Sequence, residues 1–214
     1  MFFWRVTSLL LAGVLDLAAG MLIVTLLAEH FSYSLVWWQY VVGAFLAASP
    51  DIDLLLGFFG KSLDEHHEYL THRPILGIPF AISLGWLIGG EFWGFAAGLG
   101  VFWHYMHDTQ GFLFLYDNGL AWFWPYSKKY WGIKDLKVVY RTPKQLSQSE
   151  GGAFDSLHEC YLTPTRCSVT EFTLTSIFIG YVASTVFGSI LGMTLALLFW
   201  ITIAHLWYTY RHYH

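Results

Sequence analysis

Charged residues are scarce in this sequence, since Asp, Glu, Lys and Arg make up only 12% of the 214 residues. Soluble domains carry about 25%. Hydrophobic residues account for 56% and aromatic residues for 20%, which is more apolar surface than a soluble core of this length absorbs. We therefore predict a membrane protein whose partner is the lipid bilayer.

Several functional signatures are absent as well. The sequence has no glycine-rich nucleotide-binding loop, no nucleophile elbow and no internal repeat. A net charge of −4 gives no basic footprint, so we expect no nucleic-acid partner. The two cysteines, Cys160 and Cys167, fall in a segment that we predict to be cytoplasmic. A disulfide would be unusual there, and we assign these cysteines no role.

Long apolar runs fill most of the chain. A membrane-spanning helix needs roughly 17 to 25 apolar residues, and residues 7–28 meet that length. Gly90 and Glu91 alone separate two later runs, which predicts a tight helical hairpin. The last block is too long for one pass, so either Gly188 or Gly192 turns a second hairpin, or one long helix is tilted. The remaining runs are residues 34–48, 75–89, 92–106 and 172–208.

These runs predict an all-α, multi-pass helical membrane protein with about four to six transmembrane helices. We expect one integral membrane domain, residues 1–214, with a polar insert at residues 109–170. The insert carries seven of the eleven Lys and Arg residues, and by the positive-inside rule it faces the cytoplasm. Six passes with both termini inside satisfy this rule. We therefore expect the protein to lie in the inner (cytoplasmic) membrane, with all of its polar clusters on the cytoplasmic side.

Three polar clusters sit at the ends of apolar runs, where ionisable groups are expensive and usually have a partner or a task. The first two are Asp51-Ile-Asp53, directly after Pro50, and the segment from His66 to Arg73. In the third, His104, His107 and Asp108 share one helix face because they are three and four residues apart. Imidazole with carboxylate suits zinc, manganese or iron. The clusters predict one divalent metal site.

Each cluster also has a simpler explanation. Asp51 and Asp53 can cap a helix N-terminus. The residues of the third cluster can reach water at the membrane interface, and His66 can lie in a solvated loop. Asp16 interrupts the first apolar run, and it either joins the site or marks a transport path. The convergence of three clusters on one predicted membrane face favours metal binding.

Four sequence blocks carry a family resemblance: Pro50-Asp51-Ile52-Asp53, His67-x4-His72 with Thr71 between, His104-x3-Asp108-Thr109, and Trp124-Pro125-Tyr126-Ser127. Their order resembles the YdjM-like family of inner-membrane proteins, which are LexA-regulated and described as metal-dependent hydrolases. The resemblance implies a helical, multi-pass protein distantly similar to zinc-dependent phospholipase C. It puts six residues at metal-ligand positions: Asp51, Asp53, His67, His72, His104 and Asp108. The family commonly has a histidine early in its first helix, where this chain offers Thr7, Ser8 and Asp16.

The resulting functional prediction is a membrane-bound hydrolase that uses a divalent metal, with zinc placed before manganese and iron. Asp51 and Asp108 are the candidate catalytic residues. Arg73, Lys128 and Lys129 are candidates for binding an anionic substrate, a phospholipid or another phosphate ester. Two alternatives stay open, a di-iron hydroxylase or desaturase, which also uses histidine clusters, and a non-enzymatic transport or stress-response protein.

Overall fold

The computed structural model describes residues 2–53, 69–110, 119–134, 137–141 and 160–213. Helices dominate this part of the chain, which confirms the predicted all-α fold. They are α1 (Phe2–Ala12), α2 (Val14–His30), α3 (Trp37–Ala47), the short 3₁₀ helix η3 (Leu70–His72), α4 (Pro74–Gln110), α7 (Arg166–Phe187) and α8 (Ser189–Tyr213). Two antiparallel strands, β1 (Tyr130–Lys134) and β2 (Lys137–Arg141), form a small hairpin.

Four helical stretches are long and apolar enough to cross a membrane. They are Val6–His30, Pro74–Thr109, Arg166–Phe187 and Ser189–His212. Their large apolar side chains lie largely on the outside, as Leu87 and Ile190 do with exposed fractions of 75% and 81%. Apolar surface of this extent marks contact with a membrane or another protein. The fold is therefore that of a multi-pass helical membrane protein.

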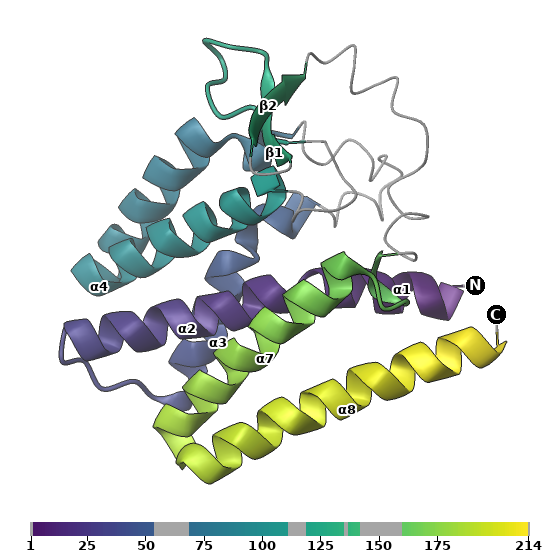
Figure 1. Cartoon of the computed structure of the whole chain (residues 1–214). Coiled ribbons are helices and arrows are strands. Elements are labelled where there is room, and N and C mark those ends of the chain that lie inside the picture. The colour runs from purple at the N-terminus through teal and green to yellow at the C-terminus, as the bar shows by residue number, and fades with distance from the viewer. Residues whose placement is uncertain (1, 54–68, 111–118, 135–136, 142–159, 214) are drawn as a thin grey trace.

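Both predicted helical hairpins are present. Helix α4 turns back on itself at Gly90, whose φ of +77° is open to glycine but costly for other residues. Its two arms then run side by side (Figure 1), so closely that a Cβ on Gly94 would lie 3.1 Å from the Cβ of Trp86. Gly188, with a φ of +92°, separates α7 from α8. This selects Gly188 over Gly192 as the turn and excludes one long tilted helix.

Helix α3 is short, and close contacts hold it in place. Its 11 residues extend for about 16 Å at roughly 1.5 Å per residue, about half of a bilayer core. It crosses α2 where Gly20 and Gly43 meet, since a Cβ on Gly20 would collide with the Gly43 carbonyl oxygen. On its other side, a Cβ on Gly100 of α4 would lie 3.1 Å from the backbone nitrogen of Ala47. Small residues of this kind let membrane helices approach closely.

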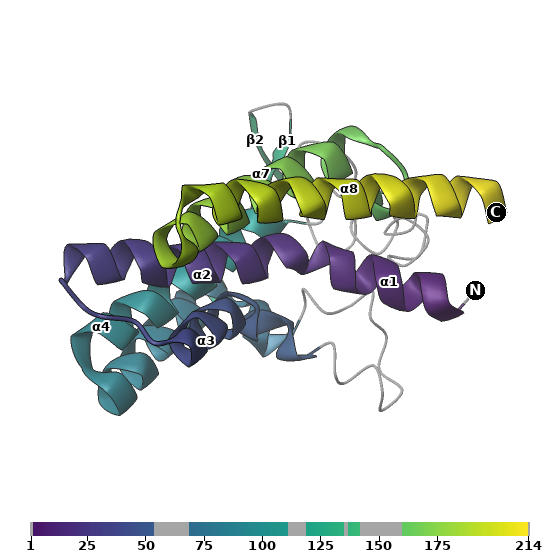
Figure 2. The same ribbon diagram turned by 90° about the horizontal axis from the view of Figure 1, so that it is seen from below.

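The two ends of the helical bundle differ. Figures 1 and 2 show both termini at one end, while the α2–α3 connection, the bend of α4 and the α7–α8 turn lie at the other. The β hairpin lies at the end of α4 that precedes it in the chain, where Trp122 Nε1 donates to Thr109 Oγ1 at 2.6 Å. The predicted polar insert therefore contains an ordered hairpin that packs on the bundle.

The cysteines correct one expectation. Cys160 and Cys167 form a disulfide in the structure, with a Cα–Cα distance of 6.2 Å. A turn between Cys160 and the first residues of α7 brings the two side chains together. The pair is buried in a cluster with Tyr161, Phe172 and Ile203, so these cysteines have a packing role that the sequence interpretation did not assign.

Candidate metal centre

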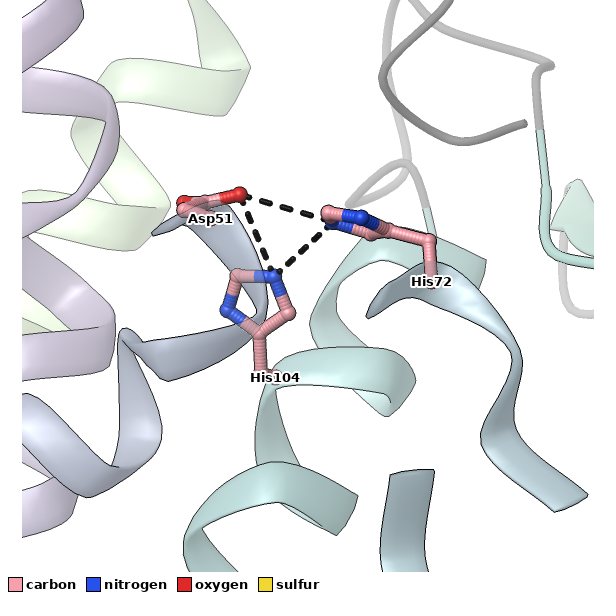
Figure 3. A group of neighbouring side chains, drawn as sticks. All are labelled: Asp51, His72 and His104. Atoms are coloured by element: carbon pink, nitrogen blue, oxygen red, sulfur yellow. Dashed lines mark hydrogen bonds and ion pairs between the residues drawn. The ribbon is translucent and has the colours of Figure 1, made fainter. Parts of the chain in front are cut away.

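Three separate segments supply the residues of the candidate metal centre. Asp51 lies in a 3₁₀ turn, residues 49–53, that follows α3 directly. His72 ends η3, immediately before α4, and His104 lies near the C-terminal end of α4. Figure 3 shows the three side chains pointing toward one another from these segments. One donor atom from each lies within 4.8 Å of the other two.

Asp108, one helical turn after His104, lies beside the two imidazoles. The Nε2 atoms of His72 and His104 are 3.4 Å apart. Asp51 Oδ1 lies 3.5 Å from the first and 3.4 Å from the second. Asp108 Oδ2 lies 3.5 Å and 3.2 Å from the same two atoms. Asp51 and Asp108 each approach both imidazoles, but only Asp51, His72 and His104 form a group in which every donor atom lies within 4.8 Å of every other.

Asp53 holds the other side of one imidazole. Its Oδ2 accepts a hydrogen bond from His72 Nδ1 at 2.9 Å and another from the Thr71 hydroxyl. The backbone oxygen of Thr71 in turn accepts a hydrogen bond from Tyr105. The structure thus puts Asp53 at Nδ1 of His72, whereas the converging donor atoms meet at Nε2. This contact fixes the ring so that Nε2 faces Asp51 and Asp108.

Burial and charge favour a cation at this centre. His72 and His104 are 0% and 1% exposed, and Asp53 is 3% exposed, so two buried imidazoles face three carboxylates. Burial would lower the pKa of His72, but hydrogen bonds with Asp51 and Asp53 and the charge of Asp108 raise it to about 9. In the same way, burial acts to raise the pKa of Asp51, yet His104 and His72 hold it well below its usual value. The carboxylates thus favour a positive charge at His72, which either a proton or a metal ion can supply.

The centre is open on its carboxylate side. The Asp51 and Asp108 side chains are 28% and 17% exposed, whereas both imidazoles are fully buried. The exposed side of the centre is therefore formed by these two carboxylates, although the Asp108 Oδ2 atom itself is buried.

The other predicted residues lie outside this group of donor atoms. His67 lies outside the described residues. Arg73 is buried, its guanidinium 5.7 Å from the Trp124 ring and 5.6 Å from the Tyr130 ring. Lys128 and Lys129 are exposed, and Lys129 Nζ lies 4.1 Å from the ring of Tyr140.

Three further buried polar residues adjoin the centre: Asp16, His107 and Glu171. Asp16 Oδ2 lies 3.2 Å from His104 Nδ1, and its Oδ1 lies 3.0 Å from His107 Nδ1. His107 Nε2 lies 3.4 Å from Glu171 Oε1. The sequence flagged Asp16 because it interrupts an apolar run, and the structure joins it to the site. Glu171 was missed, although an acid in the second turn of an apolar helix is the same kind of signal.

Comparisons with protein-family models, with curated proteins and with solved structures give no match. The resemblance to the YdjM-like family therefore stays a prediction from the four motif blocks. What can be said of the function depends on the geometry of the centre itself.

Proposed function

We propose that this protein is a membrane-bound, metal-dependent hydrolase with a mononuclear zinc centre built by Asp51, His72 and His104, with Asp108 beside it. The observation that carries the proposal is the group of three donor atoms, Asp51 Oδ1 and the Nε2 atoms of His72 and His104, which lie 3.4 to 3.5 Å from one another. They come from segments far apart in the sequence. A chance cluster of polar helix ends has no reason to match one coordination geometry.

The distances favour zinc over magnesium. Ligand atoms in a tetrahedral zinc site, with bonds of about 2.0–2.1 Å, lie about 3.3–3.4 Å apart. Neighbouring ligands around octahedral magnesium lie closer, about 2.9–3.0 Å apart. Imidazole nitrogen also suits zinc better than magnesium. The excess of carboxylates over imidazoles supplies the negative charge that a divalent ion balances.

The exposed side of the centre supports a hydrolytic function, because water can reach the Asp51 side chain there. A bound zinc ion lowers the pKa of a water molecule to about 7. Asp51, His72 and His104 would hold the ion and leave one tetrahedral position for that water, and Asp108, whose Oδ2 lies 3.2 Å from His104 Nε2, would accept its proton. His72 and His104 are buried and held at Nδ1, and they stay as fixed donors. This division makes Asp51 a metal ligand and gives Asp108 the catalytic role of proton acceptor.

A phosphate ester is the proposed substrate class, at the headgroup level of the membrane. Arg73 follows His72 directly in the sequence. Two aromatic rings lie close to its guanidinium, so its positive charge is positioned beside the centre. The exposed Lys128 and Lys129 belong to the segment between Trp122 and β1, which docks on the C-terminal end of α4. Cations at these positions attract an anionic headgroup without competing for the metal.

The site is proposed to face the cytoplasm from the inner membrane. Seven of eleven Lys and Arg residues lie in residues 109–170, which run from the end of α4 into the start of α7, and the positive-inside rule keeps such a segment in the cytoplasm. The Cys160–Cys167 disulfide points to an oxidising compartment. The basic residues are the stronger indicator of orientation, because the orientation of a membrane protein is set by the charge of whole segments. A single disulfide can be opened by a cytosolic reductant.

Phosphate release tests the hydrolase. Purified protein in lipid nanodiscs, loaded with zinc, is incubated with chromogenic phosphate monoesters and diesters and with phosphatidylcholine and phosphatidylglycerol vesicles. We expect product from wild type and none above background from His104→Ala, whereas His205→Ala, an exposed histidine of α8, retains wild-type activity. A wild-type protein that holds one zinc ion but releases no phosphate or headgroup would leave the metal centre standing and overturn the hydrolase.

A further inference from the structure

Asp16 is an acid within a membrane-spanning helix, and it is 3% exposed. A carboxylate in such a place is costly unless its oxygens are occupied. Both of them are. Oδ1 accepts a hydrogen bond from Trp103 Nε1 at 3.0 Å and lies 3.0 Å from His107 Nδ1, while Oδ2 lies 3.2 Å from His104 Nδ1.

These contacts determine which nitrogen of His104 faces the metal centre. An imidazole that gives Nε2 to a metal carries its proton on Nδ1, and a carboxylate beside Nδ1 favours that tautomer. Asp16 Oδ2 lies at Nδ1, and the Nε2 atom of the same ring lies 3.4 Å from Asp51 Oδ1. Asp16 thus lies at Nδ1 of His104 as Asp53 lies at Nδ1 of His72, at an ion-pair distance of 3.2 Å where Asp53 makes a hydrogen bond of 2.9 Å.

A second carboxylate, Glu171 on α7, is linked to Asp16 through His107. His107 bridges the two acids, with Nδ1 at Asp16 and Nε2 at Glu171 Oε1. The other oxygen of Glu171 accepts a hydrogen bond from the Tyr161 hydroxyl at 2.8 Å. The chain of contacts therefore links side chains of α2, α4 and α7, and α2 also packs on both α4 and α7.

We propose that Asp16 is a positioning residue of the metal centre, which fixes the tautomer and the direction of His104, and that Glu171 supports it through His107. This role rests on the proposed metal centre and extends it to residues that do not touch the ion. It also gives the first membrane helix a part in metal binding through a carboxylate.

Asp16→Asn is the sharpest test, because it keeps the shape and removes one acceptor. Trp103 Nε1 is a donor only, so the amide oxygen stays at the Oδ1 position and the amide nitrogen faces His104 Nδ1. That nitrogen donates, so it favours the His104 tautomer with its proton on Nε2, the atom that should bind the metal. Loss of a carboxylate partner of a metal-bound histidine typically costs 10- to 100-fold in affinity.

The experiment measures zinc dissociation constants by competition with a chromophoric chelator, on apo protein in detergent. We expect the constant to rise about 10- to 100-fold in Asp16→Asn and by a smaller factor in Glu171→Gln, which acts one contact further away. Thr175→Val on α7 is the matched control, a near-isosteric change at a fully buried hydroxyl that has no hydrogen-bond partner among the described residues. Its constant should equal that of wild type.

Two further readouts separate positioning from general stability. Cobalt-loaded Asp16→Asn should show an altered visible absorption band, and its apo form should unfold near the wild-type temperature. An unchanged zinc constant and an unchanged cobalt band in Asp16→Asn would overturn the positioning role while leaving the metal centre intact. If Asp16→Asn does not fold, Glu171→Gln decides by the same criteria. Absence of zinc binding by wild type would overturn both proposals.

Discussion

Each imidazole of the candidate centre has two different neighbours. His72 and His104 turn Nε2 toward Asp51 and Asp108, and each turns Nδ1 toward another carboxylate, Asp53 or Asp16. A histidine with both nitrogens engaged cannot rotate without losing a contact. The donor atoms are thus directed before any ion arrives, which lowers the entropic cost of binding.

Removal of a buried donor should abolish metal binding. His72→Ala and His104→Ala each take away a nitrogen from the donor set, and we expect bound zinc to fall from one ion per chain to near zero by elemental analysis. His205→Ala provides the control, since His205 is an exposed histidine of a membrane helix outside the site. One zinc ion per chain in either site variant would contradict the assigned ligands.

Zinc affinity should depend on pH in a defined direction. The pKa of His72 is raised to about 9, so in the metal-free protein it carries a proton at neutral pH, which zinc must displace. Affinity should therefore increase as the pH rises from 6 to 9, by about tenfold per pH unit for each displaced proton.

The folding stability of the metal-free protein should decrease as the pH rises, opposite to the zinc affinity. The raised pKa of His72 contributes stability that is complete below its unfolded value of about 6.5 and is lost as the pH rises through about 9. Thermal unfolding of apo and zinc-loaded protein across this range measures both effects. A zinc affinity that is flat between pH 6 and 9 would show that His72 does not bind the ion.

At the scale of elements, the short helix α3 decides where Asp51 lies. It is held between α2 and α4 by the Gly20–Gly43 crossing and by the approach of Gly100 to Ala47. The 3₁₀ turn of residues 49–53 follows without a linker. A change in the α2–α3 distance is therefore transmitted directly to the carboxylates.

Gly20→Ala should disturb both packing and metal binding. Its new Cβ would collide with the backbone oxygen of Gly43, and overpacking of this kind costs about 1–3 kcal/mol. We expect a lower unfolding temperature and weaker zinc binding. Gly13→Ala is the matched control on the same helical stretch, because its backbone is helical and the nearest atom to a Cβ there is 3.9 Å away. Equal stability of the two variants would argue against the crossing.

At the scale of the whole molecule, the hairpins at Gly90 and Gly188 return the chain to the end that holds the site. The termini lie at that end too (Figures 1 and 2). All contributing segments, from the turn after α3 to the start of α7, are thus gathered at one face of the bundle. A substrate at that membrane face would meet the centre and the basic residues together.

Reporter fusions check this arrangement. We expect a fluorescent protein at the N-terminus or the C-terminus to be bright in the cytoplasm and alkaline phosphatase at either position to be inactive, since both termini share one side. Phosphatase inserted between α2 and α3, at the opposite end, should be active. Active phosphatase at both termini would place the site on the oxidising side, in agreement with a lasting Cys160–Cys167 disulfide, and would overturn the proposed cytoplasmic orientation.

Local patterns were sufficient for the elements and for much of the candidate site. The apolar runs predicted the helices, and glycine predicted both turns, because backbone conformation and hydrophobic length are local properties. The spacing of His104 and Asp108 likewise predicted a shared helix face. Pairing of Cys160 with Cys167 was not predicted, since it depends on a turn whose geometry the sequence does not reveal.

The pattern of amino acids was enough to predict a helical membrane protein with carboxylates and histidines at helix ends. The packed helices were needed to assign each carboxylate to an imidazole nitrogen: Asp51 and Asp108 lie at the Nε2 atoms, Asp53 and Asp16 lie at the Nδ1 atoms, and Glu171 contacts His107. Which nitrogen of an imidazole faces which oxygen depends on the packing of α2, α3, α4 and α7 against one another, and these contacts join residues up to 91 positions apart.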